Sequence, residues 1–178
     1  SYTEDDLLIS YENRLEKIQD TEIGIQLFGM YASFNHTKYR IFMKAILNCF
    51  MKYKDNLQYQ IAYIHLVNEI VQKEVPENVE LFLPAIESMS IKAAETRDES
   101  HIARVKRVLA ILQDRKIIDS QKVARILSLM DSHQQTGPDE DNLITDQLES
   151  LTRDLIQAKK DVKKFLEEKR PDNELLPA

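Results

Sequence analysis

Glycine, cysteine and tryptophan are scarce in this 178-residue chain, and each shortage excludes a class of fold or site. The sequence has three glycines and no tryptophan, too few glycines for the many tight turns of a β-sandwich or barrel. Cys49 is the single cysteine, which excludes a disulfide framework and a thiolate zinc site and fits a reducing compartment. No uncharged apolar run approaches a bilayer span, and the first residues lack a signal-peptide pattern. We therefore expect a soluble, intracellular, helical protein.

The charged residues are numerous but unevenly distributed. Hydrophobic residues make up 43% of the chain, enough for a folded core, and the net charge is −6, which disfavours unspecific binding to nucleic acid or anionic membranes. Residues 37–75 nevertheless hold six basic groups against three acidic ones, and residues 101–126 hold seven against two, between acidic segments. The two basic blocks either meet as one anion-binding surface or remain separate solvated helix faces, and the sequence leaves both open.

Apolar residues recur at helical spacing throughout residues 1–131. The spacing predicts helices at about 4–18, 21–34, 37–53, 57–73, 77–96, 100–114 and 119–130. Thr37 is expected to cap the third of them, and Pro84 predicts a kink or a split within the fifth. No segment is typical of a strand. Short connections between helices favour a right-handed stack of helix hairpins or a compact bundle.

The last third of the chain has a different pattern. Residues 132–142 form an acidic segment with one glycine, typical of a linker. Residues 143–170 then show apolar positions in alternating steps of four and three, typical of a coiled coil of about three heptads, and 171–178 is a polar tail. The stripe packs either on the first domain or on a partner helix, as a homodimer or with another protein. It comprises Ile144, Leu148, Leu151, Leu155, Ala158, Val162 and Phe165.

Motifs of catalysis and of metal binding are missing. The sequence contains no glycine-rich phosphate loop, no nucleophile elbow and no zinc-protease helix motif. The four histidines lie far apart in the sequence, without carboxylates at ligand spacing. Cys49 lies between Ile46 and Phe50 on an apolar face, where a buried structural thiol is expected. We therefore predict no enzyme activity, no metal site and no cofactor.

Two of the predicted helices contain the candidate binding residues. In the helix at 57–73, apolar residues fill one broad arc and polar residues the opposite arc. A helix this apolar is expected at the centre of the fold, with its polar arc at a groove. Three arginines at 104, 107 and 115 fall within about 80° of one another around their helix. Such a strip of arginines either binds a phosphate through bidentate hydrogen bonds or is neutralised by the acidic segments of the same chain.

At these positions the chain resembles the domain that interacts with the C-terminal repeats of RNA polymerase II, the CID. Residues 65–72, His-Leu-Val-Asn-Glu-Ile-Val-Gln, are similar to the family's fourth-helix pattern. Residues 107–115, Arg-Val-Leu-Ala-Ile-Leu-Gln-Asp-Arg, are similar to its seventh-helix pattern. The resemblance covers about residues 4–131 and implies an all-α, right-handed superhelix of about eight helices, like that of ENTH and VHS domains.

The resemblance implies a groove between the fourth and seventh helices for an extended phosphorylated heptad peptide. Asn68 and Glu69 would hydrogen-bond the turn of the peptide and its tyrosine. Arg115 would pair with a phosphoserine, and Arg107 would line the same groove. A dianionic phosphate facing Arg115 gains charge-assisted hydrogen bonds that an unphosphorylated serine cannot supply.

Three positions depart from the family pattern and mark a divergent member. Glu69 replaces the usual aspartate and is one methylene longer, and His65 replaces the usual tyrosine. Lys73 stands where a neutral amide is common, so it would add a cation to the groove. These departures leave open whether the ligand is the polymerase tail, an atypical tail or an unphosphorylated segment.

A linker followed by a coiled-coil helix also resembles the regulation of nuclear pre-mRNA domain proteins, where that helix supports dimerisation. The expected function is therefore a nuclear, non-catalytic module that binds phosphorylated polymerase repeats in transcription or RNA 3′-end processing and termination. Membranes and direct nucleic-acid contacts are not expected. Two alternatives are a degenerate CID-like scaffold for protein assembly and an ENTH/VHS-type trafficking adaptor. The acidic residues 1–6 oppose the adaptor, which would need a basic or amphipathic N-terminus.

Overall fold

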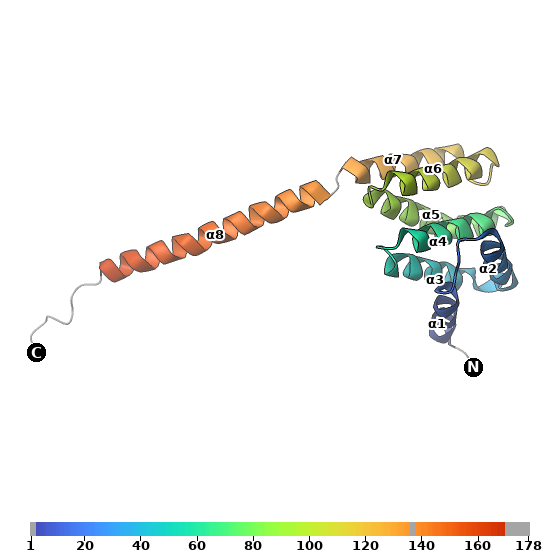
Figure 1. Cartoon of the computed structure of the whole chain (residues 1–178), viewed down its shortest axis with the longest axis horizontal. Helices are drawn as coiled ribbons and strands as arrows, with labels where there is room; N and C mark the ends of the chain where they lie inside the picture. The colour runs from blue at the N-terminus through green and yellow to red at the C-terminus, as the bar shows by residue number, and fades with distance from the viewer. Residues whose placement is uncertain (1–2, 136–137, 170–178) are drawn as a thin grey trace, which may run out of the picture. The chain divides into compact units, whose positions relative to one another are not determined.

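The fold is all-α in a computed structural model that describes residues 3–135 and 138–169 (Figure 1). The described residues form eight α-helices and one 3-10 helix, and none of them lies in a strand. The prediction of an all-α fold is confirmed. The chain divides into two compact units, residues 1–135 and 136–178. None of the described helices has the length and apolarity needed to cross a membrane.

Short polar side chains begin several helices of the first unit. Thr3, Thr21, Asn56 and Asp98 each accept a hydrogen bond from a backbone N–H in the first turn that follows, which satisfies a donor that the helix leaves unpaired. The helices of the unit are α1 Glu4–Leu15, α2 Glu22–Phe34, η1 His36–Lys38, α3 Tyr39–Lys52, α4 Leu57–Val71, α5 Pro76–Glu95, α6 Glu99–Asp114 and α7 Ser120–Gln135.

Each helix of the first unit packs most extensively on the helix two positions away. The five largest contacts are α1 with α3, α2 with α4, α3 with α5, α4 with α6, and α5 with α7 (Figure 1). Odd-numbered and even-numbered helices therefore form two layers. Nine of the 15 residues of α4 are buried, because α4 is enclosed by α2, α6 and the odd-numbered layer. The predicted central position of this helix is confirmed.

Two tyrosines of α4 hold the turn between α1 and α2 in place. The hydroxyl of Tyr63 donates to the carbonyl of Leu15 at 3.0 Å, and that of Tyr59 donates to the carbonyl of Glu16 at 3.1 Å. Burial raises the pKa of Tyr63, so its hydroxyl remains a hydrogen-bond donor at neutral pH. The turn that contains Asp20 is thereby fixed beside the first half of α4.

The third long helix begins later than predicted. Thr37 does not cap it, because residues 36–38 form the 3-10 helix η1 and α3 begins at Tyr39 without a side-chain cap. The Tyr39 side chain is buried and its hydroxyl bonds to Glu74. The tight turn directs Tyr39 into the core, and packing of a large side chain prevails over the local capping preference.

The predicted split at Pro84 does not occur, since α5 is one continuous helix of 20 residues. Proline has no N–H to donate to the carbonyl of Glu80, and it disfavours the helix interior. Buried apolar residues on both sides of Pro84, including Phe82 and Ile86, nevertheless fix α5 between its neighbours. Because α5 is not divided, the motif that the family has on its seventh helix lies on α6 in this chain.

Replacing Pro84 with alanine is expected to stabilise the protein. Pro84 is exposed, and alanine would restore the missing N–H without disturbing the core. We expect the free energy of unfolding to rise by about 1–2 kcal/mol, part of the roughly 3 kcal/mol by which proline disfavours a helix interior. Urea denaturation measures the change. Pro76→Ala is the matched control, because proline at the first helical position costs little; equal effects of both substitutions would contradict the expectation.

The second unit contains one long helix, α8, which spans Pro138–Glu168. It begins earlier than the predicted residue 143, and α7 extends to Gln135. Described residues in the predicted linker are therefore helical, and Pro138 occupies the first helical position that suits proline. Residues 170–178, which include the predicted tail, lie outside the described part. The predicted stripe lies along α8 with 52–65% of each large side chain exposed: Ile144, Leu148, Leu151, Leu155, Val162 and Phe165.

Candidate functional site

The candidate site is a polar strip of half-buried residues along the second half of α4 and the residue that follows it, where the other side chains of the helix are buried. The strip consists of His65, Asn68, Glu69 and Gln72. Because α2 and α6 pack on opposite flanks of α4, these side chains reach solvent only along the line between the two neighbours. Helical periodicity in the sequence predicts that His65, Asn68 and Glu69 share one face of the helix. In the structure these three residues do lie on one face of α4.

Hydrogen bonds between side chains join α4 to α6 at both ends. Near the start of the helices, Gln60 Oε1 and His101 Nε2 lie 3.0 Å apart in the core, and burial lowers the pKa of His101. Near their ends, Arg115 donates to Gln72 Oε1. The two helices therefore run in the same direction. Between these bonds lies a cavity of only about 20 Å³ under Asn68, too small for a ligand.

The other flank of the strip is closed by α2 and the turn before it. A Cβ atom on Gly29 would lie 2.8 Å from Cγ of Glu69, so α2 approaches α4 closely because this position is glycine. Asp20 Oδ1 lies 2.7 Å from Nδ1 of His65. His65 and Glu69 are thus held from the α2 side, which fixes where their polar atoms lie.

Lys73 and Arg115 lie at the C-terminal end of the strip, whereas Arg107 lies about two turns earlier on α6. Lys73 forms an ion pair with Glu69, and Arg115 is bonded to Gln72. Arg107 is exposed and makes no hydrogen bond or ion pair within the described residues. Arg107 and Arg115 are separated by eight positions, about 12 Å along α6. Asn68 and Arg115 lie where α4 meets α6, His65 and Glu69 lie on the α2 side of the strip, and Arg107 is exposed on α6. We call the polar strip of α4 together with Lys73, Arg107 and Arg115 the α4–α6 face.

Two further residues belong to the α4–α6 face and were not among the predicted site residues. Gln72 connects Asn68 and Arg115, since its amide donates to Asn68 Oδ1 at 2.8 Å. Arg104 lines a hollow of about 430 Å³ together with Asp20 and Gln58 at the start of α4. The spacing of three positions between Arg104 and Arg107 places both on the same side of α6, so the sequence could have indicated Arg104. The role of Gln72 depends on its contact with Arg115, which no local sequence pattern reveals.

The two basic blocks of the sequence do not merge into one surface. The lysines and arginine of residues 38–54 lie on η1, α3 and the turn that follows, and α3 packs against α1, α4 and α5. Lys73, the last cation of this block, follows α4 and adjoins the α4–α6 face. Of the second block, Lys106 is paired with Asp131 on α7 at 3.5 Å. The anion-binding potential therefore depends on α6 and Lys73.

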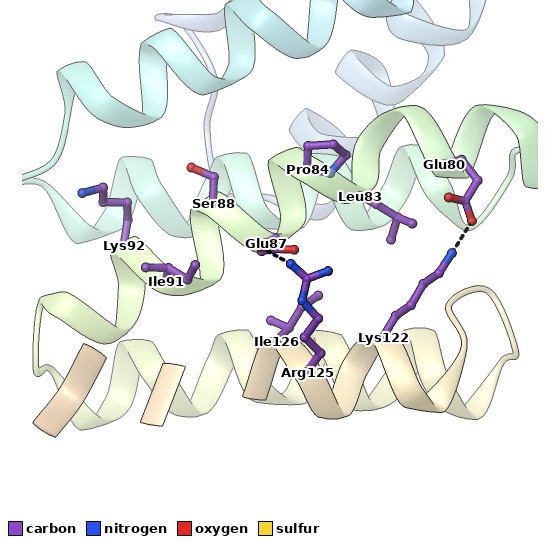
Figure 2. Close-up of a pocket in the computed structure, with 10 residues that line it drawn as sticks. All are labelled: Glu80, Leu83, Pro84, Glu87, Ser88, Ile91, Lys92, Lys122, Arg125 and Ile126. Atoms are coloured by element: carbon purple, nitrogen blue, oxygen red, sulfur yellow. Dashed lines mark hydrogen bonds and ion pairs between the residues drawn. The ribbon is translucent and has the colours of Figure 1, made fainter. Parts of the chain in front are cut away.

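A second cleft, of about 560 Å³, lies between α5 and α7 (Figure 2). Lys122 lies 2.6 Å from Glu80, and Arg125 lies 3.3 Å from Glu87 across it (Figure 2). Both cations already have a carboxylate partner, and exposed pairs of this kind contribute little to stability. This cleft is consequently a weaker candidate for an anionic ligand than the α4–α6 face.

The described residues offer no obvious centre for covalent or metal chemistry. No group of three or more histidine, cysteine, aspartate or glutamate side chains among them is arranged to hold a metal ion. Cys49 is buried, and burial raises the pKa of its thiol to about 11. The thiolate that would act as a nucleophile is therefore nearly absent at neutral pH.

Comparison with known proteins identifies a family for most of the chain. The sequence model of the CID domain matches residues 10–126. This range contains the end of α1, all helices from α2 to α6 and the first turns of α7, with all six predicted site residues. No curated protein matches the chain.

Proposed function

Because the chain belongs to the CID family, we propose that its α4–α6 face binds phosphorylated heptad repeats of the RNA polymerase II C-terminal tail. CID domains are protein-interaction modules that bind this tail and act in transcription and RNA processing. The observation that most supports the proposal is that the two family-like motifs, residues 65–72 and 107–115, lie along helices that pack on each other and are joined by the bond between Gln72 and Arg115.

The cations of α6 favour a phosphorylated ligand. Arg107 has an exposed guanidinium without a partner among the described residues. Arg115 is bonded to the neutral amide of Gln72, and exchanging that partner for a dianionic phosphate strengthens the hydrogen bond. An unphosphorylated serine offers neither arginine a comparable acceptor.

The α4 side supplies groups for the backbone and the tyrosine of a peptide. Asn68 accepts from Gln72 through Oδ1, and its NH₂ group has no acceptor among the described residues. That amide is therefore free to donate to a peptide carbonyl. Glu69 pairs with Lys73 through Oε1, which leaves its second carboxylate oxygen for a hydroxyl donor such as tyrosine.

The spacing of the arginines suggests which phosphorylation pattern binds best. About 12 Å separates Arg107 and Arg115 along α6, which equals roughly three to four residues of an extended peptide. A single phosphate cannot pair fully with both guanidinium groups. We infer that a repeat with two phosphates three residues apart engages both arginines at once.

A panel of heptad-repeat peptides tests the proposal. The full chain is titrated by calorimetry with peptides that are unphosphorylated, singly phosphorylated at each serine, or doubly phosphorylated three residues apart. We expect the doubly phosphorylated peptide to bind most tightly and the unphosphorylated one most weakly. A doubly phosphorylated peptide of scrambled order controls for charge alone. Equal affinity for the ordered and scrambled peptides, or no binding of any phosphoform, would reject the proposal.

The exposed stripe of α8 supports a dimer of this module in the nucleus. Its large apolar side chains are more than half exposed and follow a heptad spacing, so a second helix is needed to bury them. We propose that α8 of a second copy supplies it. Two linked α4–α6 faces would then engage one repetitive tail together, which raises the apparent affinity through effective concentration. Binding to polymerase implies a nuclear location.

A further inference from the structure

The outer face of α2 exposes an apolar stripe that the proposed function does not use. Ile23, Leu27, Met30 and Phe34 have 71%, 59%, 53% and 83% of their surface exposed. They follow one another at steps of four, three and four, so they form one line of about three turns along the helix. The buried residues of α2, which include Gly29, lie on the opposite side towards α4. Exposed apolar lines of this length are typical of interaction sites.

A hollow of about 700 Å³ adjoins this stripe between α1 and α2. Leu27 belongs to both the stripe and the hollow, and exposed Ile9 of α1 extends the apolar surface on the other side. We call the stripe and the hollow together the α1–α2 surface. A hollow between two helices with an apolar line along one of them fits the mode in which a third, amphipathic helix lies in a groove. The hollow is lined by Asp6, Ile9, Ser10, Asn13, Arg14, Lys17, Leu27, Phe28 and Tyr31.

The charges of the hollow favour an acidic partner. Arg14 lies over the ring of Tyr31 at 4.8 Å, and neither Arg14 nor Lys17 has a carboxylate partner among the described residues. The one acid that lines the hollow is Asp6, which already accepts from the backbone N–H of Thr3 at 3.0 Å in a capping box. A second copy would bring the same two cations and the same engaged carboxylate, so the charges do not favour self-association through this surface.

We propose that the α1–α2 surface docks an amphipathic helix of a partner protein whose apolar stripe is edged by acidic residues. The apolar side chains of that helix pack on Leu27 and its neighbours, and its carboxylates face Arg14 and Lys17. This surface lies on the outer side of α2, away from α4, so the module has a second binding surface independent of the α4–α6 face.

Synthetic helices of about three turns serve as probes. One peptide has leucines at positions i, i+4, i+7 and i+11 with glutamates along one edge, a second has lysines in place of the glutamates, and a third has the glutamates but leucines out of register. Fluorescence anisotropy is measured on the full chain with Leu148→Gln and Leu155→Gln, which interrupt the exposed apolar stripe of α8 and so reduce its competition for the peptides. We expect the glutamate-edged peptide to bind at least about 10-fold tighter than either control peptide.

Substitutions then locate the binding. Leu27→Gln and Phe34→Ser are each expected to weaken binding by about 10-fold or more, and circular dichroism checks that these exposed changes leave the fold intact. Lys17→Glu is expected to reverse the preference towards the lysine-edged peptide. Met51→Gln and Lys54→Glu, exposed changes at the end of α3 and beyond it, are the matched controls and should leave binding unchanged.

Several results would overturn the inference. The glutamate- and lysine-edged peptides could bind equally, or Leu27→Gln and Phe34→Ser could both leave binding unchanged. If Leu27→Gln or Phe34→Ser lowered the mass measured by sedimentation, the occupant of the α1–α2 surface would be a second copy of the chain instead. Loss of glutamate-edged peptide binding on Arg107→Ala would place that peptide on the α4–α6 face. The panel of phosphorylated heptad peptides tests binding at the α4–α6 face. A negative result with the helical peptides therefore does not contradict the proposed function.

Discussion

Replacing Arg107 and Arg115 together with alanine is expected to lower the affinity for a doubly phosphorylated repeat by about 100-fold or more. A hydrogen bond to a charged group contributes roughly 1.5–3 kcal/mol, so each single substitution should cost about 10-fold to 100-fold. The two positions are about 12 Å apart along α6 and have different partners, so their effects should be nearly additive. Isothermal titration calorimetry measures all four combinations.

The specificity of this result depends on two comparisons. Affinity for the unphosphorylated repeat should change little, because the arginines act through phosphate. Arg125→Ala is the matched control, since Arg125 is an exposed arginine paired with Glu87 in the cleft between α5 and α7 and should leave phosphopeptide affinity unaltered. If the double variant binds every peptide as the parent does, α6 does not recognise phosphate. If the double substitution lowers the affinity for all peptides equally, the arginines have a structural role instead.

Placing lysines in the apolar stripe of α8 is expected to convert a dimer into a monomer. Leu151→Lys and Leu155→Lys together put two like charges per helix into the centre of the proposed helix pair, where they would be desolvated and would repel those of the partner. Sedimentation equilibrium should then give a mass near 20.8 kDa in place of twice that value. The apparent affinity for a long repetitive phosphopeptide should fall by about 100-fold or more, while that for a single repeat stays constant.

The matched control adds the same charge to α8 outside the stripe. Ser150→Lys and Gln157→Lys change exposed residues of α8 that lie outside the apolar stripe by helical periodicity, and they should preserve the dimer. A parent chain that sediments as a monomer at all tested concentrations would refute the dimer. A dimer that persists in the Leu151→Lys and Leu155→Lys variant would show that another surface pairs the copies.

The helical periodicity of the sequence was sufficient to predict those features that depend on a single helix. It placed the polar strip of α4 on one side, predicted α4 as a central helix, and identified the exposed stripe of α8. These features follow from local geometry, because helical spacing alone determines which side chains share a face.

Features that depend on contacts between helices could not be derived in this way. Local rules predicted a kink or a split at Pro84, yet α5 continues as one helix with Phe82 and Ile86 packed in the core. The bond between Gln72 and Arg115 joins residues that are 43 positions apart, and no spacing rule links them. In α2, apolar residues occur on both sides, so the sequence alone does not reveal that Ile25 is buried and Leu27 exposed.

Gln72 gives the α4–α6 face a property that its separate residues lack. Its amide nitrogen donates to Asn68 while its amide oxygen accepts from Arg115, and both atoms belong to one rigid plane. The side chain therefore cannot rotate to serve one neighbour without disturbing the other. A ligand that withdrew Arg115 from Gln72 would leave this plane free to turn, so we expect binding at Arg115 to affect the amide of Asn68 on α4. If the face binds a peptide as proposed, we expect the contacts of Asn68 and Arg115 with that peptide to be energetically coupled through this glutamine.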